Sequence, residues 1–238
     1  MSFVISTDRS SYYVLEPVRV ALILRNESAD PIRGHFLPNL EIGNLDIFYR
    51  RQGGEFVKYS CARQARPPDV ILLPKTLQPQ QEVKEEEILV FDTRRGQYIL
   101  EEPGIYEFKA IYRDSPSDSP NARLESNILR VKVEPAPGNE REALKLYEDE
   151  GLARLIQHDP YSEEALDQAV QFLETYHYSV YAPSVRSGLV WGLGRKVHSQ
   201  RATRAERELY ETLWAEEVQE RYPEELEKLE EHKNKPKP

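Results

Sequence analysis

The fold is decided by the stretch Pro103-Gly104-Ile105-Tyr106-Glu107-Phe108-Lys109-Ala110-Ile111-Tyr112. After the Pro-Gly turn, apolar and aromatic side chains at 106, 108, 110 and 112 alternate with charged side chains at 107 and 109. Alternation with a period of two places one set of side chains on a core face and the other in water, which is typical of a half-buried β-strand. We therefore predict a strand here, with Gly104 and Tyr106 in structural roles at its start.

Other strand signals extend outward from this stretch. Residues 18–26 give the strongest one in the N-terminal half, because Val18, Val20, Leu22 and Leu24 alternate with Arg19, Ala21 and Ile23. Shorter signals occur at 3–5, 45–50, 55–59, 70–73, 88–91 and 127–133, and the acidic Glu85–Glu87 is expected to separate two of them. Roughly seven short strands spaced by turn residues are typical of a two-sheet sandwich.

The pattern changes after Glu134, where Pro135 and Pro137 cannot continue a strand ladder. From residue 139 the hydrophobic period becomes about 3.6, which indicates helices. We expect a first helix over about 139–156, a second capped by Ser162, a third opened by Pro183 and a fourth capped by Thr203.

These patterns predict an α+β protein with segregated domains. An all-β sandwich is expected over 1–135, followed by a linker at 136–138, an all-α helical hairpin domain over 139–232 and a disordered tail at 233–238.

Three motifs resemble known families. Tyr13-Val14-Leu15-Glu16-Pro17-Val18, with the turn at 103–106 and the closing strand 126–131, resembles bacterial immunoglobulin-like domains. In those domains a glycine stands where this chain has Leu15, and the resemblance implies an immunoglobulin-like sandwich with Tyr106 as a tyrosine corner. The layout of residues 12–112 is also loosely similar to the sandwich of bacterial intracellular proteinase inhibitors. Residues 172–183 resemble a helix junction of tetratricopeptide-like proteins over about one repeat.

Composition excludes several kinds of function. The net charge is -9, with 18 basic against 20 acidic residues in 1–135 and 14 against 21 in 136–238. Nucleic-acid binding is not expected, because it needs a clustered positive face. No run approaches the ~20 apolar residues of a membrane helix, so we expect no membrane insertion. The sequence shows no signal peptide, which predicts a cytoplasmic protein as written and an envelope or secreted protein if a leader was removed.

No catalytic, metal or cofactor site is predicted. The five histidines are scattered singly, and the single cysteine, Cys61, lies near no general base in the sequence. Gly192-Leu193-Gly194 follows a helix instead of opening one, so these glycines are expected to end the third helix and not to cradle a phosphate.

Two features are candidates for protein binding. Arg63 and Arg66 stand beside Pro67-Pro68 in a loop of an otherwise acidic protein. The second feature is a group of aromatic residues in the helical half, Tyr176, Tyr178, Tyr181 and Trp191. They either pack in the core of this half or line a peptide groove at the helix junction.

The sequence favours a non-catalytic interaction module that binds a protein or peptide partner of unknown identity. One alternative is a protease-inhibitor-like sandwich that presents the loop from Arg63 to Asp69. Another is an enzyme with a site between the two domains, in which His158 or His177 meets carboxylates that are distant in the sequence.

Overall fold

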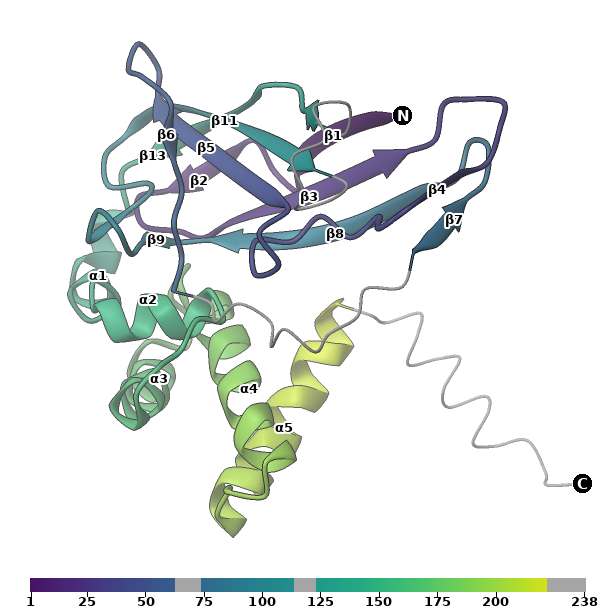
Figure 1. The fold of residues 1–238 in the computed structure, drawn as a ribbon. Coiled ribbons are helices and arrows are strands. Elements are labelled where there is room, and N and C mark those ends of the chain that lie inside the picture. Colours follow the sequence, from purple (N-terminus) through teal and green to yellow (C-terminus); the bar gives the residue numbers. More distant parts are fainter. Residues whose placement is uncertain (63–73, 114–122, 222–238) are drawn as a thin grey trace, which may run out of the picture.

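A computed structural model describes residues 1–62, 74–113 and 123–221 of the 238-residue chain. The fold is mixed α+β, with strands in the N-terminal part and helices in the C-terminal part (Figure 1). The predicted strand at 70–73, the last part of the predicted helical domain at 222–232 and the tail at 233–238 lie outside the described residues.

One sheet has the strand order β1-β3-β8, and both pairings are antiparallel. Its strands are β1 (Ser2–Thr7), β3 (Val18–Arg25) and β8 (Glu82–Leu89). The prediction that Glu85–Glu87 separates two strands is wrong, because these residues lie within β8. Glu87 is buried and accepts a 3.0 Å hydrogen bond from the backbone nitrogen of Leu40, while Glu86 pairs with Arg19 of β3 at 2.9 Å.

A second sheet has the order β2-β13-β11-β5-β6, with β12 paired to β11. Its strands are β2 (Ser11–Tyr13), β5 (Leu45–Arg51), β6 (Val57–Lys58), β11 (Gly104–Arg113), β12 (Arg123–Glu125) and β13 (Leu129–Glu134). The pairing of β2 with β13 is parallel and the other pairings are antiparallel. Two small ribbons join β4 (Ile32–Gly34) to β7 (Lys75–Leu77) and β9 (Phe91–Asp92) to β10 (Gln97–Tyr98).

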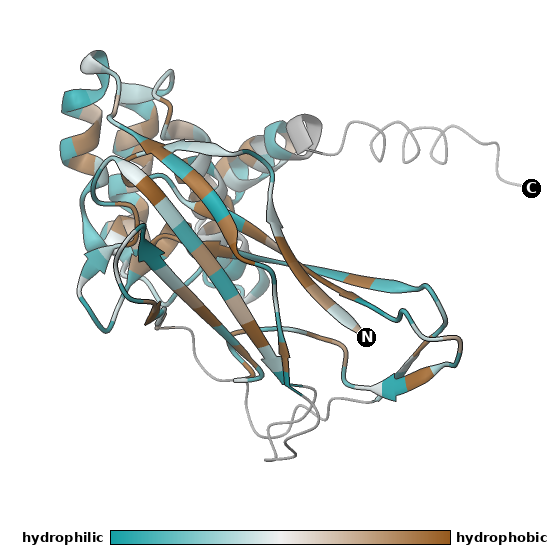
Figure 2. Cartoon of the chain, turned by 90° about the horizontal axis from the view of Figure 1, so that it is seen from above, coloured by the Kyte–Doolittle hydropathy of each residue, from teal (hydrophilic) through white to brown (hydrophobic). Residues whose placement is uncertain are grey.

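The two sheets enclose a hydrophobic core. The predicted central strand is observed as β11, and its Tyr106, Phe108, Ala110 and Tyr112 are all buried. Tyr112 meets Phe3 of β1 with ring centroids 5.9 Å apart, so side chains of the two sheets are in contact. Figure 2 shows the alternation of hydrophobic and hydrophilic residues along the strands that places these side chains inside.

The helical part contains a short 3-10 turn, η2 (Gly138–Glu140), and five α-helices. They are α1 (Arg141–Tyr147), α2 (Glu150–Ile156), α3 (Glu163–Tyr176), α4 (Ala182–His198) and α5 (Arg204–Arg221). The single helix predicted over 139–156 is therefore divided. Asp149 is the cause, because its side chain accepts a 3.0 Å hydrogen bond from the backbone nitrogen of Leu152 and caps α2.

The prediction that Gly192 and Gly194 end a helix is also wrong, since α4 continues to His198. Glycines in α4 instead permit close helix packing. A Cβ atom on Gly188 would lie 2.9 Å from the Cα atom of Ile156 in α2, and one on Gly192 would lie 2.7 Å from a methyl carbon of Leu166 in α3.

The strands and the helices are packed together. The helices gather beside the end of the sheets at which β9 lies (Figure 1), and the buried hydrophobic residues of both parts form one cluster. The Tyr98 hydroxyl donates a hydrogen bond to the carbonyl of Tyr147 in α1, and the Tyr181 hydroxyl donates one of 2.9 Å to the carbonyl of Val14. The connection after β13 thus joins two parts that share buried contacts.

Candidate functional site

A hollow of about 480 Å³ lies between α4 and α5, and we call it the α4–α5 groove. Its lining is mainly apolar and aromatic, and the residues are His158, Ser187, Val190, Trp191, Gly194, Arg195, His198, Tyr210, Trp214 and Glu217. The chain has two tryptophans, Trp191 and Trp214, and both line this groove. Concave sites of this size with mostly apolar walls are where small molecules and peptide side chains bind.

Local sequence explains how α5 forms one wall. Thr203 and Glu206 make a capping box, in which the Thr203 side chain accepts a 3.2 Å hydrogen bond from the Glu206 nitrogen and the Glu206 carboxylate accepts one of 2.6 Å from the Thr203 nitrogen. Gly194 lets the Tyr210 ring come close, since a Cβ atom there would lie 3.2 Å from it. Within the described side chains of α5, 204–217, none is fully buried, and Trp214 is 49% exposed.

The opposite wall holds Trp191 in a fixed position. Its ring stacks on His158 with centroids 4.8 Å and planes 9° apart, and it meets the edge of Tyr161 at 5.6 Å. His158 has a positive φ of 63° just after α2, and Tyr161 donates a 2.8 Å hydrogen bond to the carbonyl of Gly192. The indole ring is therefore held by two residues of the connection between α2 and α3.

Basic residues lie at the edge of the groove, although the net charge of the chain is negative. The Arg195 guanidinium lies 5.1 Å from the Trp191 ring centroid and forms no ion pair with the described carboxylates. Nδ1 of His198 lies 2.6 Å from the carbonyl of Gly194. Lys196 is bound by Glu163 and Glu206, and these contacts raise the pKa of its ammonium group. Arg195 is thus a cation available to a ligand at this rim.

The aromatic residues predicted for binding do not form one cluster. Trp191 lines the groove, but Tyr181 is wholly buried beside Tyr147, with ring centroids 4.4 Å apart. Tyr176 is partly buried against Phe172 at 5.5 Å. Tyr178 is 91% exposed between α3 and α4. Arg63 and Arg66 lie outside the described residues.

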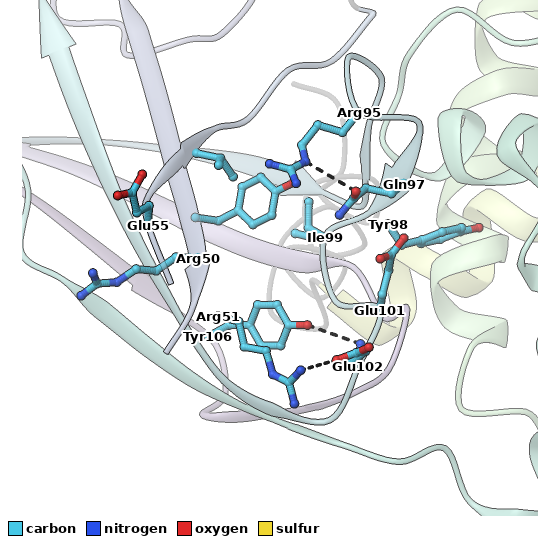
Figure 3. A pocket seen from close by; sticks show the side chains of 12 residues that line it. Arg50, Arg51, Glu55, Arg95, Gln97, Tyr98, Ile99, Glu101, Glu102 and Tyr106 are labelled. Atoms are coloured by element: carbon cyan, nitrogen blue, oxygen red, sulfur yellow. Dashed lines mark hydrogen bonds and ion pairs between the residues drawn. The ribbon is translucent and has the colours of Figure 1, made fainter. Parts of the chain in front are cut away.

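A second hollow, of about 220 Å³, lies beside β5 and the turn that precedes β11, and we call it the edge pocket (Figure 3). It is formed in part by the two predicted structural residues. The Tyr106 hydroxyl accepts a 3.3 Å hydrogen bond from the backbone nitrogen of Glu102, four residues upstream. Gly104 has a φ of +153°, and a Cβ atom there would lie 2.9 Å from Nε of Arg51, so this position needs glycine.

The edge pocket contains several charged groups. Arg51 is engaged by the carboxylate of Glu102 and the carbonyl of Pro103. Glu101 stands beside them, and partial burial together with the neighbouring Glu102 carboxylate raises the pKa of its carboxyl group. Tyr49 also lines the edge pocket, and its hydroxyl donates a 3.1 Å hydrogen bond to Asp92. Burial and the adjacent Asp92 carboxylate raise the pKa of this hydroxyl.

Sequence reasoning missed most residues of both hollows. The stripe Leu209, Tyr210, Leu213 and Trp214 signals an apolar helix face, but a period of 3.6 alone does not show that this face is incompletely covered. For Arg95 and Glu101 the sequence contains no signal, because they meet only through the pairing of β9 with β10 and the turn before β11.

The histidines do not gather into a metal site. The described part of the chain holds no group of three or more His, Cys, Asp or Glu side chains placed to bind a metal ion. His177 is exposed next to Tyr178, whereas His158 and His198 both line the α4–α5 groove. Across residues 1–62, 74–113 and 123–221, no helix combines the length and apolar composition that a membrane span requires.

No family model and no curated protein matches the chain. Solved structures with some similarity include a β-glucosidase from Erythrobacter marinus (17% identity, 56% of this chain, 15% of that chain, TM-score 0.30). A second is the alkylpurine DNA glycosylase AlkC from Pseudomonas fluorescens (8% identity, 56% of this chain, 30% of that chain, TM-score 0.32). A third is the sporulation control protein Spo0M from Bacillus subtilis (11% identity, 60% of this chain, 54% of that chain, TM-score 0.32). The chain therefore spans 15–54% of these three chains, and TM-scores this low support no inference about fold or activity.

Proposed function

We propose that the protein is a non-catalytic interaction module whose α4–α5 groove binds an amphipathic helical segment of a partner protein. The observation that carries this proposal is the incomplete burial of α5. Tyr210 and Trp214 of its apolar stripe line a hollow of about 480 Å³, and Trp214 is half exposed there. A third helix laid between α4 and α5 would bury this stripe, which is the usual mode of helix-in-groove recognition.

The chemistry of the partner follows from the lining. Trp214 is the expected anchor, because half-exposed tryptophans in apolar hollows often carry much of the binding energy. Arg195 at the rim lacks a carboxylate partner among the described residues, so an acidic residue beside the partner's apolar stripe would complete an ion pair. The partner segment is thus a helix with aliphatic or aromatic residues at helical spacing and an acidic flank.

We also propose that the strands form an immunoglobulin-like sandwich that supports the helices. Two mainly antiparallel sheets that enclose one hydrophobic core support this, because that is the architecture of such sandwiches. The hydrogen bond between Glu102 and Tyr106 has the form of a tyrosine corner. The proteinase-inhibitor alternative depends on Arg63 and Arg66, which lie outside the described residues.

A second candidate function is acid–base catalysis in the same groove. It is favoured by the presence of His158, His198 and Glu217 in one lining. Turnover of p-nitrophenyl acetate or butyrate that falls in both His158→Ala and His198→Ala would support catalysis. Absence of turnover, together with peptide binding that depends on Trp214, would favour the binding module.

The binding proposal is tested by selecting helical peptides from a displayed library against the full chain. Peptides with apolar residues at i, i+3 and i+4 and an acidic flank should be enriched. Their binding should be lost in Trp214→Ala and kept in Tyr178→Ala, which removes a more exposed aromatic residue away from the groove. Enrichment that is equal on both variants would overturn the proposal.

A further inference from the structure

Two side chains of opposite charge line the edge pocket without pairing with each other. The Arg95 guanidinium makes one long hydrogen bond, 3.5 Å from its Nε to the Gln97 side-chain oxygen, and no ion pair with the described carboxylates. Glu101 likewise forms no ion pair with the described cations. In Figure 3 these two residues come from different segments on either side of the pocket.

Arg95 lies on a turn whose backbone is fixed by hydrogen bonds to a buried carboxylate. The carboxylate of Asp92 accepts hydrogen bonds from the backbone nitrogens of Arg94 (3.1 Å) and Arg95 (3.2 Å), and its second oxygen accepts the Tyr49 hydroxyl (3.1 Å). Asp92 is wholly buried, so it fixes the turn between β9 and β10 from inside. The base of the Arg95 side chain is therefore held in place without a ligand.

The backbone beside Glu101 is held as well. Leu100 accepts a 2.8 Å hydrogen bond from the nitrogen of Leu15, and Glu102 donates its nitrogen to the Tyr106 hydroxyl. Arg51 binds the Glu102 side chain and the carbonyl of Pro103, so the cation nearest to this turn is already engaged. The Glu101 carboxylate interacts with the backbone of Tyr98 but forms no ion pair with the described cations, so it can still accept a hydrogen bond from a ligand. Sites whose groups are positioned in advance lose less entropy on binding.

Between these charges the pocket offers apolar contact and one more donor. Ile99, Val57 and the rings of Tyr49 and Tyr106 line it. The Tyr106 hydroxyl accepts one hydrogen bond and donates none to the described residues, so its proton is available to a ligand oxygen. The volume of about 220 Å³ suits one small molecule and not a folded segment.

We propose that the edge pocket binds a free α-amino acid, whose carboxylate pairs with Arg95 and whose ammonium group pairs with Glu101. A guanidinium is suited to a carboxylate because it can donate two parallel hydrogen bonds. Glu55 also lines the pocket and forms no described ion pair, so the available charges sum to one negative. Basic amino acids therefore bind more tightly than acidic ones.

Titration calorimetry of the full chain with lysine, leucine and glutamate tests this site. Lysine should bind most tightly. Lysinamide, which lacks the carboxylate, and Nα-acetyl-lysine, which lacks the α-ammonium group, should each bind at least about tenfold more weakly. Arg95→Gln and Glu101→Gln should weaken lysine binding by a similar factor. Arg94→Gln, on the same turn but outside the lining, should leave binding unchanged.

The proposal is overturned if none of the three amino acids gives saturable binding at about 10 mM. It is also overturned if lysine binds wild type, Arg95→Gln and Glu101→Gln equally. Thermal unfolding of each variant shows whether it is folded, and both substituted side chains are exposed. Trp214→Ala should not alter lysine binding, so this test is independent of the α4–α5 groove.

Discussion

The hydroxyl group of Tyr59 donates a 3.0 Å hydrogen bond to the side-chain oxygen of Gln157, which is wholly buried at the end of α2. The same oxygen accepts a 2.8 Å hydrogen bond from the backbone nitrogen of Phe91. The Gln157 amide nitrogen donates at 2.5 Å to Asp159, whose carboxylate also accepts the backbone nitrogen of Ala62 at 2.8 Å. Two polar residues of the helical part, Gln157 and Asp159, thus bind Tyr59, Ala62 and Phe91 of the strand-containing part.

Replacing Gln157 with leucine should destabilise the whole protein. Leucine has a similar size, but it leaves the buried donors of Tyr59 and Phe91 without this acceptor, which costs about 2–4 kcal/mol. Tyr59→Phe removes one donor and leaves the Phe91 bond in place, so it should cost only about 1 kcal/mol. Urea unfolding measures both values. A Gln157→Leu protein as stable as wild type would show that these bonds do not hold the two parts together.

The glycines of α4 give a second prediction. Gly188→Ala places a Cβ atom 2.9 Å from the backbone of Ile156, so α2 and α4 must move apart. We expect a loss of about 1–3 kcal/mol, although alanine normally favours a helix. Gly138→Ala is the control, because nothing lies within 4 Å of its Cβ position and its change should stay within about 0.5 kcal/mol. Equal stability of the two variants would contradict this account of the packing.

Leu15 has a φ of 64° and a buried side chain. Leu15→Gly and Leu15→Ala both lose that burial, but only glycine adopts the left-handed region without strain. The glycine variant should therefore be more stable than the alanine variant by roughly 1 kcal/mol, which reverses their usual order. Urea midpoints of the two proteins decide this, and a more stable alanine variant would mean that the backbone relaxes.

Glu206 predicts a pH dependence at the start of α5. The hydrogen bond from Lys196 is the main reason why the pKa of the Glu206 carboxyl group falls from 4.5 to about 2. The folded state binds this proton more weakly than the unfolded state. The stabilisation by the ionised Glu206 carboxylate is therefore complete above pH 4.5 and is lost as the pH falls towards 2. The difference in unfolding free energy between wild type and Glu206→Gln should shrink over that range. A difference that does not vary with pH would exclude this ion pair as a source of stability.

The sequence predicted what depends on local patterns. The alternation around Phe108 gave β11, and Ser162 and Thr203 correctly marked the starts of α3 and α5. The sequence-based prediction was wrong where contacts between distant segments determine the structure. Glu87 lies in a strand that pairs with β3, and its buried carboxylate is bound by the backbone of Leu40. Gly192 lies within α4, where a Cβ atom would meet Leu155 and Leu166.

The candidate sites were less predictable than the fold. Trp191 was identified as a candidate, but its separation from the buried Tyr181 depends on which side of α4 faces the strands. Arg95 and Glu101 are brought to one pocket by two turns that no short motif in the sequence connects. The pattern of residue types therefore predicted which faces of the strands and helices are buried, but it did not predict the hollows between these elements.

The most direct test of the binding module uses its two tryptophans, which both line the α4–α5 groove. A selected acidic helical peptide without tryptophan is titrated into the full chain while the indole fluorescence is recorded. The account predicts a saturable blue shift, as the half-exposed Trp214 leaves water, and affinity reduced at least about tenfold in Arg195→Gln but unchanged in Tyr178→Ala. Saturable binding with no change in the emission of either tryptophan would place the peptide elsewhere and contradict the account.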